Sequence, residues 1–532
     1  MNAPANTGRT LTQKVVSNTA FNLLGKAWSI LIALFLTPYI VGRIGVDRYG
    51  IWALVSVVTE YFGLLDLGIG SSYVKFIAEY YTTKSFDKIN GVVNSGLVFY
   101  LGFTAVSLTL AYLFQDRIIG LCNIPPELEA ETLFAFWTGL LTFCVVNAAS
   151  SFVAVQSGLQ RMDIYNKVSV AISLPRVAGT IWALENGYGL RGLILVNAFA
   201  MLLAGIINAA AAFRLLPQLE LSVRHFRKDV FMTLLGYGSK LQVARVSSTI
   251  SVTLDKLLLT HYLSVGLVTF FQLASTVIEQ AKSLPILLMQ ALIPAFSELD
   301  ARGDRAKVCD SYIRGTRYMT LLAMPLFTFL IADADQLMLL WMGPGYEKSA
   351  AVIRILAVGW GLAVIAGVRS VVLQAIAKPG IEMNAGLIAA VFNIPLSIFF
   401  IRQMGFTGVA LGTTVALAMS VMYGFYGLNR ELGLPAGFYI KALIPQGLAL
   451  CAGAGALAWA SALAASAFCG TGRMGAFLVL ALSGLVFCAA YIALLARFKP
   501  FDKADCLRIE HAFARIPARF VKLFARREPS GL

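Results

Sequence analysis

Apolar stretches separated by short polar segments recur along almost the whole chain. A membrane-spanning helix needs about 20 mainly apolar residues, and these stretches approach or exceed that length. They lack the alternation of a transmembrane barrel, and a helix satisfies its own backbone hydrogen bonds in lipid. We therefore expect fourteen helical spans, at about residues 17–41, 49–70, 91–114, 131–155, 167–184, 192–213, 236–260, 268–293, 315–332, 351–375, 384–401, 407–427, 441–466 and 475–496.

A weak internal repeat relates the two halves of the chain. Arg245 lies 219 positions after Lys26, and the same offset pairs Glu60 with Glu279. Charges inside membrane spans are rare, so matched charges carry more weight than matched apolar residues. Coincidence in a biased composition is the alternative. The repeat predicts an all-α fold, a polytopic transmembrane helical bundle with two six-helix lobes related by a parallel pseudo-two-fold axis, followed by two C-terminal helices.

The spans and the loop charges together predict a domain order and an orientation. Lys and Arg favour one set of loops by roughly four to one, and such loops are cytoplasmic in most membrane proteins. Both termini are then cytoplasmic. The expected parts are an N-terminal segment (1–16), an N-lobe (17–214), a basic cytoplasmic linker (215–235), a C-lobe (236–430), a final helix pair (441–496) and a basic amphipathic cytoplasmic tail (497–532).

Composition excludes most soluble functions. Hydrophobic residues make up 58% of the 532 residues and charged residues 13%, whereas soluble domains carry about 25% charged residues. The net charge of +15 is dispersed over many loops, which suits lipid headgroups better than nucleic acid. Three scattered His and seven Cys without a CxxC pair give no metal spacing or disulfide framework. We expect no enzyme, metal or cofactor, apart from possible coupling to H⁺ or Na⁺.

Charged residues inside the expected spans are the candidate site. Each costs about 2.5–3.5 kcal/mol on insertion scales, so it usually faces a watery cavity or an opposite charge. The cations exceed the acids, which predicts a cationic cavity for an anionic ligand such as a pyrophosphate. The candidate substrate-binding cations are Lys26, Arg176, Arg245, Lys256, Lys282 and Arg369. The candidates for charge pairing or ion coupling are Glu60, Asp66, Asp255 and Glu279.

Five short motifs occur in the order found in polysaccharide flippases. They are Gly-Val-Asp-Arg-Tyr-Gly-Ile-Trp (45–52), Leu-Asp-Leu-Gly-Ile-Gly (65–70), Gly-Leu-Gln-Arg (158–161), Leu-Trp-Met-Gly (340–343) with Tyr346, and Gly-Phe-Thr-Gly-Val-Ala (405–410). The chain thus resembles the polysaccharide-transport branch of the multidrug/oligosaccharidyl-lipid/polysaccharide exporter superfamily. The resemblance implies a V-shaped pair of six-helix lobes, with cavity cations at Lys26 and Arg245. Family members often carry Arg at the first position, so Lys26 is a departure.

The same resemblance implies a function. Similar proteins flip undecaprenyl-pyrophosphate-linked oligosaccharides across the bacterial inner membrane for exopolysaccharide, O-antigen or capsule assembly. Partners would be the lipid-linked substrate, membrane lipids and a polysaccharide polymerase and export machinery. A cation-coupled multidrug exporter of the same fold is one alternative, although its cavity would be acidic. A membrane glycan polymerase or glycosyltransferase is another, although the expected extracytoplasmic loops are short and carry no nucleophile–base motif.

Overall fold

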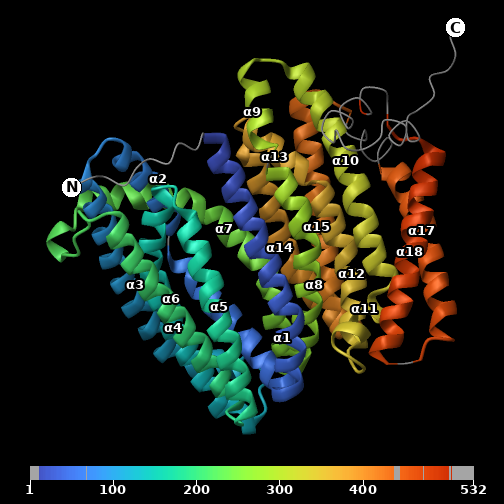
Figure 1. The fold of residues 1–532 in the computed structure, drawn as a ribbon, viewed down its shortest axis with the longest axis horizontal. Coiled ribbons are helices and arrows are strands. Elements are labelled where there is room, and N and C mark those ends of the chain that lie inside the picture. The colour runs from blue at the N-terminus through green and yellow to red at the C-terminus, as the bar shows by residue number, and fades with distance from the viewer. Residues whose placement is uncertain are drawn as a thin grey trace. The chain divides into compact units, whose positions relative to one another are not determined.

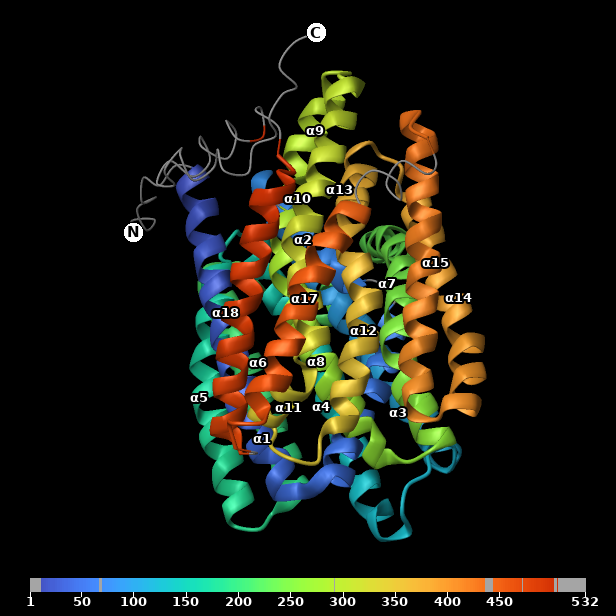
Figure 2. The ribbon, with the colours of Figure 1, turned by 90° about the vertical axis from the view of Figure 1, so that its right-hand side faces the viewer.

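The structure is a computed structural model that describes residues 11–66, 69–290, 292–435, 444–470, 472–501 and 505. The chain is a set of long helices, and no strand occurs in those ranges (Figures 1 and 2). The all-α expectation is therefore confirmed. The chain divides into two compact units, residues 1–272 (unit 1) and 273–532 (unit 2).

Unit 1 contains the first seven helices and the beginning of the eighth. Their bounds are α1 (Leu11–Phe62), α2 (Ile69–Thr82), α3 (Phe86–Gly120), α4 (Glu129–Gly158), α5 (Met162–Glu185), α6 (Gly189–Leu215), α7 (Lys228–Tyr262) and α8 (Val265–Gln290). Three single 3₁₀ turns accompany them: η1 (Gly63–Asp66), η2 (Pro126–Leu128) and η3 (Val223–His225).

Unit 2 contains the rest of α8 and the later helices. Their bounds are α9 (Ile293–Ala301), α10 (Arg305–Ala332), α11 (Ala334–Trp341), α12 (Glu347–Ile365), α13 (Gly367–Ala375), α14 (Pro379–Met404), α15 (Phe406–Leu432), α17 (Ile444–Ser466) and α18 (Arg473–Phe498). The neighbours α14 and α15 run side by side, as do α17 and α18 (Figures 1 and 2).

Eleven helical segments of the described residues are long and apolar enough to cross a membrane. One of them, Trp28–Phe62 within α1, overlaps the first two expected spans, between which the helix kinks where Gly45 has φ +82°. Glycine suits that backbone conformation because it has no Cβ. Helices α5 and α7 lie at two further expected spans, although neither is apolar enough to count among the eleven. Within the described residues, each of the fourteen expected spans thus lies mostly in helix.

The second expected span differs most from its prediction. Instead of ending near residue 70, the chain breaks at η1 (63–66) and then forms α2 up to Thr82. Polar residues near the start of α2 lower the local hydropathy, so the sequence pattern did not predict that the helix resumes there. Its Ser72 is fully buried and donates a hydrogen bond to the Leu234 carbonyl of α7, 2.9 Å away.

Helix ends repeat between the two halves at the offset found in the sequence. Thr82 ends α2 and Ala301 ends α9, 219 positions later. Glu185 ends α5 and Met404 ends α14, again 219 positions later. These helix ends are independent of the matched charges and are a second observation in favour of the repeat. The two halves share one order of helices.

Side chains of α3 hold the first part of the expected linker (215–235). Asn90 donates to the Gln218 carbonyl at 2.9 Å and accepts from the Glu220 amide at 3.0 Å. Asn94 likewise donates to the Glu220 carbonyl and accepts from the Ser222 amide at 2.9 Å. These buried amides satisfy backbone groups that a loop would otherwise expose.

The last two helices pack on α10 of unit 2. Phe487 of α18 contacts Phe329 of α10, with ring centroids 5.6 Å apart. Tyr491 donates a hydrogen bond to the Leu321 carbonyl at 2.7 Å. A Cβ on Gly455 of α17 would lie 2.6 Å from the Thr328 side chain, so this close approach requires glycine. The final pair is therefore an integral part of unit 2.

Candidate functional site

A cavity of about 940 Å³ lies within unit 1. Helices α1 to α6 all contribute to its wall. That volume is at the upper end of the range of about 300–1,000 Å³ for small-molecule sites. The polar residues of its wall are mostly uncharged: Ser29, Thr37, Asn147, Ser150, Ser157, Asn166, Ser169, Ser173, Thr180, Asn197 and Asn208. Its aromatic residues are Trp28, Trp52, Tyr100 and Tyr165.

Helix α5 supplies a continuous polar face to this cavity. Asn166, Ser169, Ser173, Arg176 and Thr180 follow one another at spacings of three and four, and all five line the wall. Residues at such spacings share one face of a helix. The sequence contained this signal, but from this span we named only the charged residue Arg176 as a candidate, and so missed its uncharged polar neighbours.

Arg176 is the one charged residue of the described cavity wall. It is half-buried, and no described residue forms an ion pair or hydrogen bond with its guanidinium. A guanidinium presents five donors in a fixed fork that suits phosphate and carboxylate oxygens. The cavity thus combines one available cation with many neutral hydrogen-bonding groups, a set of partners suited to a polar anion.

Hydrogen bonds between helices fix the wall around Arg176. Trp28 of α1 donates its indole N–H to the Ser173 hydroxyl at 2.7 Å, one turn before Arg176. Between α4 and α6, buried Gln156 donates to the side-chain oxygen of the cavity residue Asn208 at 3.0 Å. These contacts join four of the six helices, so the wall is preorganised rather than collapsed.

Beyond the cavity, an ion pair joins the part of α1 just before its kink to the end of α5. Arg43 lies 2.5 Å from a carboxylate oxygen of Glu185, and Tyr39 donates its hydroxyl to the same oxygen at 2.6 Å. Thr37 and Thr180, about one turn earlier on each helix, line the cavity. The triad therefore closes the gap between these two helices beside the site.

Two of the predicted cations lie in unit 2 and have acidic partners. Lys282 is 9% exposed, 2.5 Å from Glu279, and its ammonium lies 3.5 Å from the centroid of the Trp360 ring. Arg369 is 5% exposed and donates to Glu382 at 3.1 Å. For these two residues the arrangement favours charge pairing over ligand binding.

The remaining predicted residues are placed less completely. Lys26, Arg245 and Asp66 lie in helical backbone, but their side chains are outside the described part of the structure. On α7, Asp255 is buried and Lys256 half-buried. Glu60 is exposed on α1. Their roles stay predictions.

Metal binding finds no support in the described ranges, which contain no group of three His, Cys, Asp or Glu able to hold an ion.

The expected tail (497–532) is described only at its start, up to residue 501, and at Asp505.

Comparison with known proteins identifies what the chain is similar to. A family model described as "Polysaccharide biosynthesis protein" matches residues 15–300. A putative O-antigen transporter of Shigella flexneri is 20% identical over 419 residues, which cover 77% of this chain and 96% of the relative. The family match confirms the resemblance drawn from the short motifs.

Solved structures share the fold. The lipid II flippase MurJ, in an inward closed conformation, gives a TM-score of 0.66 at 14% identity, over 91% of this chain and 99% of MurJ. An inward-facing multidrug resistance MATE family transporter of the MOP superfamily gives 0.60 at 16% identity, over 81% and 96%. At these identities the likeness establishes the fold alone.

Proposed function

The chain belongs to the polysaccharide biosynthesis protein family, and on that premise we propose that it is a flippase for a lipid-linked oligosaccharide. The observation that carries the proposal is the unit 1 cavity, whose described wall holds many neutral polar groups and the single cation Arg176. Sugar hydroxyls hydrogen-bond to neutral polar groups and the C–H faces of sugar rings pack on aromatic side chains, whereas phosphate needs a cation. A lipid-linked oligosaccharide presents both.

Within this proposal, each part of the substrate has a place. Arg176 binds the pyrophosphate, and Lys26, two residues before the cavity residue Trp28 in α1, adds a second positive charge. The serines and asparagines of α4 to α6 hold the first sugars. The polyprenyl chain stays in lipid, because burying it in a polar cavity would forfeit its hydrophobic stabilisation.

The transport cycle we propose is alternating access across the bacterial inner membrane, with both termini cytoplasmic. Movement runs from the cytoplasmic to the periplasmic leaflet. An inside-negative potential favours the outward movement of an anionic headgroup by about 2.3 kcal/mol per charge per 100 mV. The carboxylates Glu60, Asp66 and Asp255 are the candidates for coupling to H⁺ or Na⁺, whereas Glu279 is already paired with Lys282.

A multidrug exporter is the second function available to this fold. Cationic drugs are held by acidic and aromatic cavities, but the described wall of the unit 1 cavity contains no carboxylate. Its one charge would repel a cation. The charge of the cavity therefore favours the oligosaccharide.

The decisive experiment deletes the gene and follows the lipid-linked glycan. We expect surface polysaccharide to be lost and the lipid-linked glycan to accumulate where a glycan-cleaving enzyme added to spheroplasts cannot reach it. Reintroducing the wild-type gene should restore both. Normal surface polysaccharide in the deletion strain, or a glycan fully accessible from outside, would refute the proposal. Sensitivity of the deletion strain to cationic drugs, with normal glycan, would favour the exporter.

A further inference from the structure

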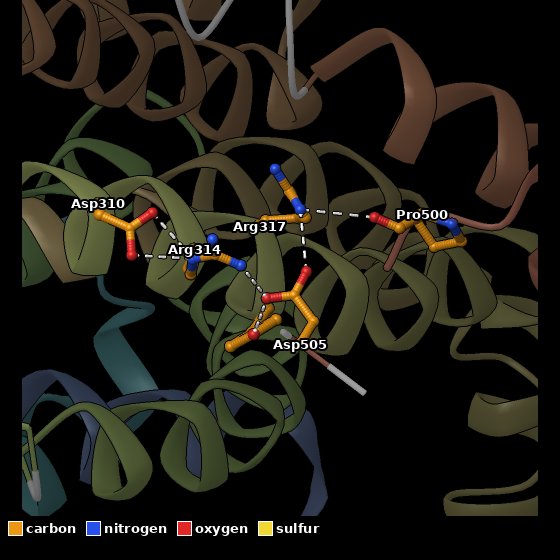
Figure 3. A network of polar contacts seen from close by, with 6 residues as sticks. Asp310, Arg314, Arg317, Pro500 and Asp505 are labelled. Carbon is orange, nitrogen blue, oxygen red and sulfur yellow. Dashed lines mark hydrogen bonds and ion pairs between the residues drawn. The ribbon is translucent and has the colours of Figure 1, made fainter. Parts of the chain in front are cut away.

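The carboxylate of Asp505 is fully buried in unit 2, although it lies seven residues beyond the last membrane helix. Arg314 of α10 lies 2.5 Å from one of its oxygens, and Arg317 lies 3.1 Å from the other (Figure 3). Tyr318 donates its hydroxyl to the first oxygen. Three donors on one helix thus converge on a single anionic group, as they do in sites that bind phosphate.

These donors do not all depend on Asp505 for their position. The Arg314 Nε lies 2.9 Å from both carboxylate oxygens of Asp310, one turn earlier on α10 (Figure 3). That contact orients the guanidinium with or without Asp505. Arg317 also donates to the Pro500 carbonyl at 3.5 Å, a contact that belongs to the same segment as Asp505. Asp310 therefore orients the Arg314 side of the site, whereas Pro500 and Asp505 supply the contacts on the Arg317 side.

The charges of the cluster select the kind of anion that could replace Asp505. Arg314 and Arg317 balance Asp310 and Asp505, so the cluster is neutral as it stands. Without Asp505 it carries one positive charge. A phosphodiester carries one negative charge and offers two free oxygens, as a carboxylate does, so it restores the balance at the same donors.

The surroundings supply such an anion. The site lies where α18, a candidate membrane span ending at Phe498, has just left the apolar region. Lipid headgroups lie at that depth. The sequence beyond Asp505 is strongly basic, and such segments gather anionic lipids at the membrane surface. Phosphodiester groups are thus concentrated beside a site that binds them.

We propose that Arg314, Arg317 and Tyr318 form a phosphodiester site for anionic lipid headgroups, which Asp505 occupies in this structure and vacates when such a headgroup binds. Exchange breaks the contacts of Asp505 with α10. The proposal is independent of the proposed transport function, since its residues belong to unit 2, none of them lines the unit 1 cavity, and its occupancy is measured without transport. The alternative is a permanent tether in which Asp505 never leaves.

The first test uses the wild-type protein in nanodiscs made of phosphatidylcholine alone or with phosphatidylglycerol. Trypsin cleavage after Lys503 reports release of the segment. We expect phosphatidylglycerol to accelerate this cleavage several-fold relative to cleavage at other sites. Inorganic phosphate in phosphatidylcholine discs is the second arm, and acceleration there alone would assign the site to a free anion. Equal cleavage rates in all three conditions would establish the tether and overturn the proposal.

The second test measures binding of phosphatidylglycerol by native mass spectrometry in detergent. Asp505→Asn removes the internal competitor, so we expect about tenfold tighter apparent binding, because a self-occupied site weakens its ligand by the fraction occupied. Arg317→Gln in the Asp505→Asn background should abolish the gain. Glu298→Gln, which removes one acidic charge from an exposed ion pair with Arg302, is the matched control and should bind as wild type does. If Asp505→Asn bound phosphatidylglycerol no more tightly than Glu298→Gln does, the proposed site would be refuted.

Discussion

Replacing Glu382 with Gln should destabilise unit 2 without changing substrate binding. Arg369 is nearly buried, and its guanidinium donates to Glu382 at 3.1 Å and to the Val421 carbonyl at 3.3 Å. The fit is tight, since a Cβ on Gly424 would lie 1.8 Å from an Arg369 nitrogen. Glu382→Gln keeps the shape of the side chain and removes its charge. It leaves a buried guanidinium without its carboxylate.

The magnitude follows from the burial of the two partners. Breaking a fully buried ion pair costs about 3–5 kcal/mol, because the remaining charge stays uncompensated. The Glu382 side chain is 36% exposed, so water replaces part of the lost interaction. We therefore expect a loss of about 2 kcal/mol in the free energy of unfolding, which corresponds to about 5 °C in the melting midpoint for a unit of this size.

The assay is thermal unfolding in detergent, beside complementation of the deletion strain at low temperature. Asp335→Asn is the matched control, because it breaks the exposed pair of Asp335 with Arg354 in the same unit. Exposed pairs contribute about 0–1 kcal/mol, so this control should melt near the wild-type temperature. An unchanged melting midpoint for Glu382→Gln, together with lost transport, would refute the reasoning and return Arg369 to the substrate site.

Three further predictions concern other parts of the molecule. Arg176→Ala should weaken binding of a pyrophosphate-linked glycan, measured by titration, by about 10- to 150-fold. That factor corresponds to the loss of a charge-assisted hydrogen bond of about 1.5–3 kcal/mol. Arg191 is exposed, so the control Arg191→Ala should leave binding unchanged. Burial raises the pKa of Asp333 from 3.8 to about 6, so its protonated form favours the folded state and stability is lost as pH rises from 4 through 6. Asp333→Asn should remove that pH dependence and gain about 3 kcal/mol at pH 7.5, seen as a higher melting midpoint. Gly50→Ala should lower the melting midpoint, because the new Cβ would lie 2.2 Å from the Val265 carbonyl oxygen, whereas Gly42→Ala meets nothing within 4 Å.

Hydropathy predicted the helices well because lipid leaves the backbone no other choice. It failed at the break after Phe62, where the helix resumes as α2 with buried Ser72 and Tyr73 on its inner face. Those side chains face protein, and a hydropathy window averages them with their neighbours. Protein-facing polar residues thus concealed this helix, and its counterpart α9, which ends 219 positions later, also lies outside the expected spans.

Charges were found from the sequence, but their partners were found only where the partner was local. Glu279 and Lys282 are three apart on one helix, and their pairing was one of the two interpretations that the spacing allowed. Arg369 and Glu382 lie on different helices, on either side of the turn at Lys378. No periodicity links such residues. The sequence therefore could not distinguish paired Arg369 from available Arg176.

The repeat gives this difference a physical meaning. At the offset of 219, Glu382 corresponds to Asp163, and both stand in the first turn of matching helices, α14 and α5. Arg369 corresponds to Ser150, which lines the unit 1 cavity. In the second half, the cation Arg369 pairs with Glu382 and is neutralised. In the first half, the corresponding residue Ser150 is small and leaves space in the cavity. The shared framework therefore carries different chemistry in its two halves, and the described residues leave an available cation beside an open cavity in the first.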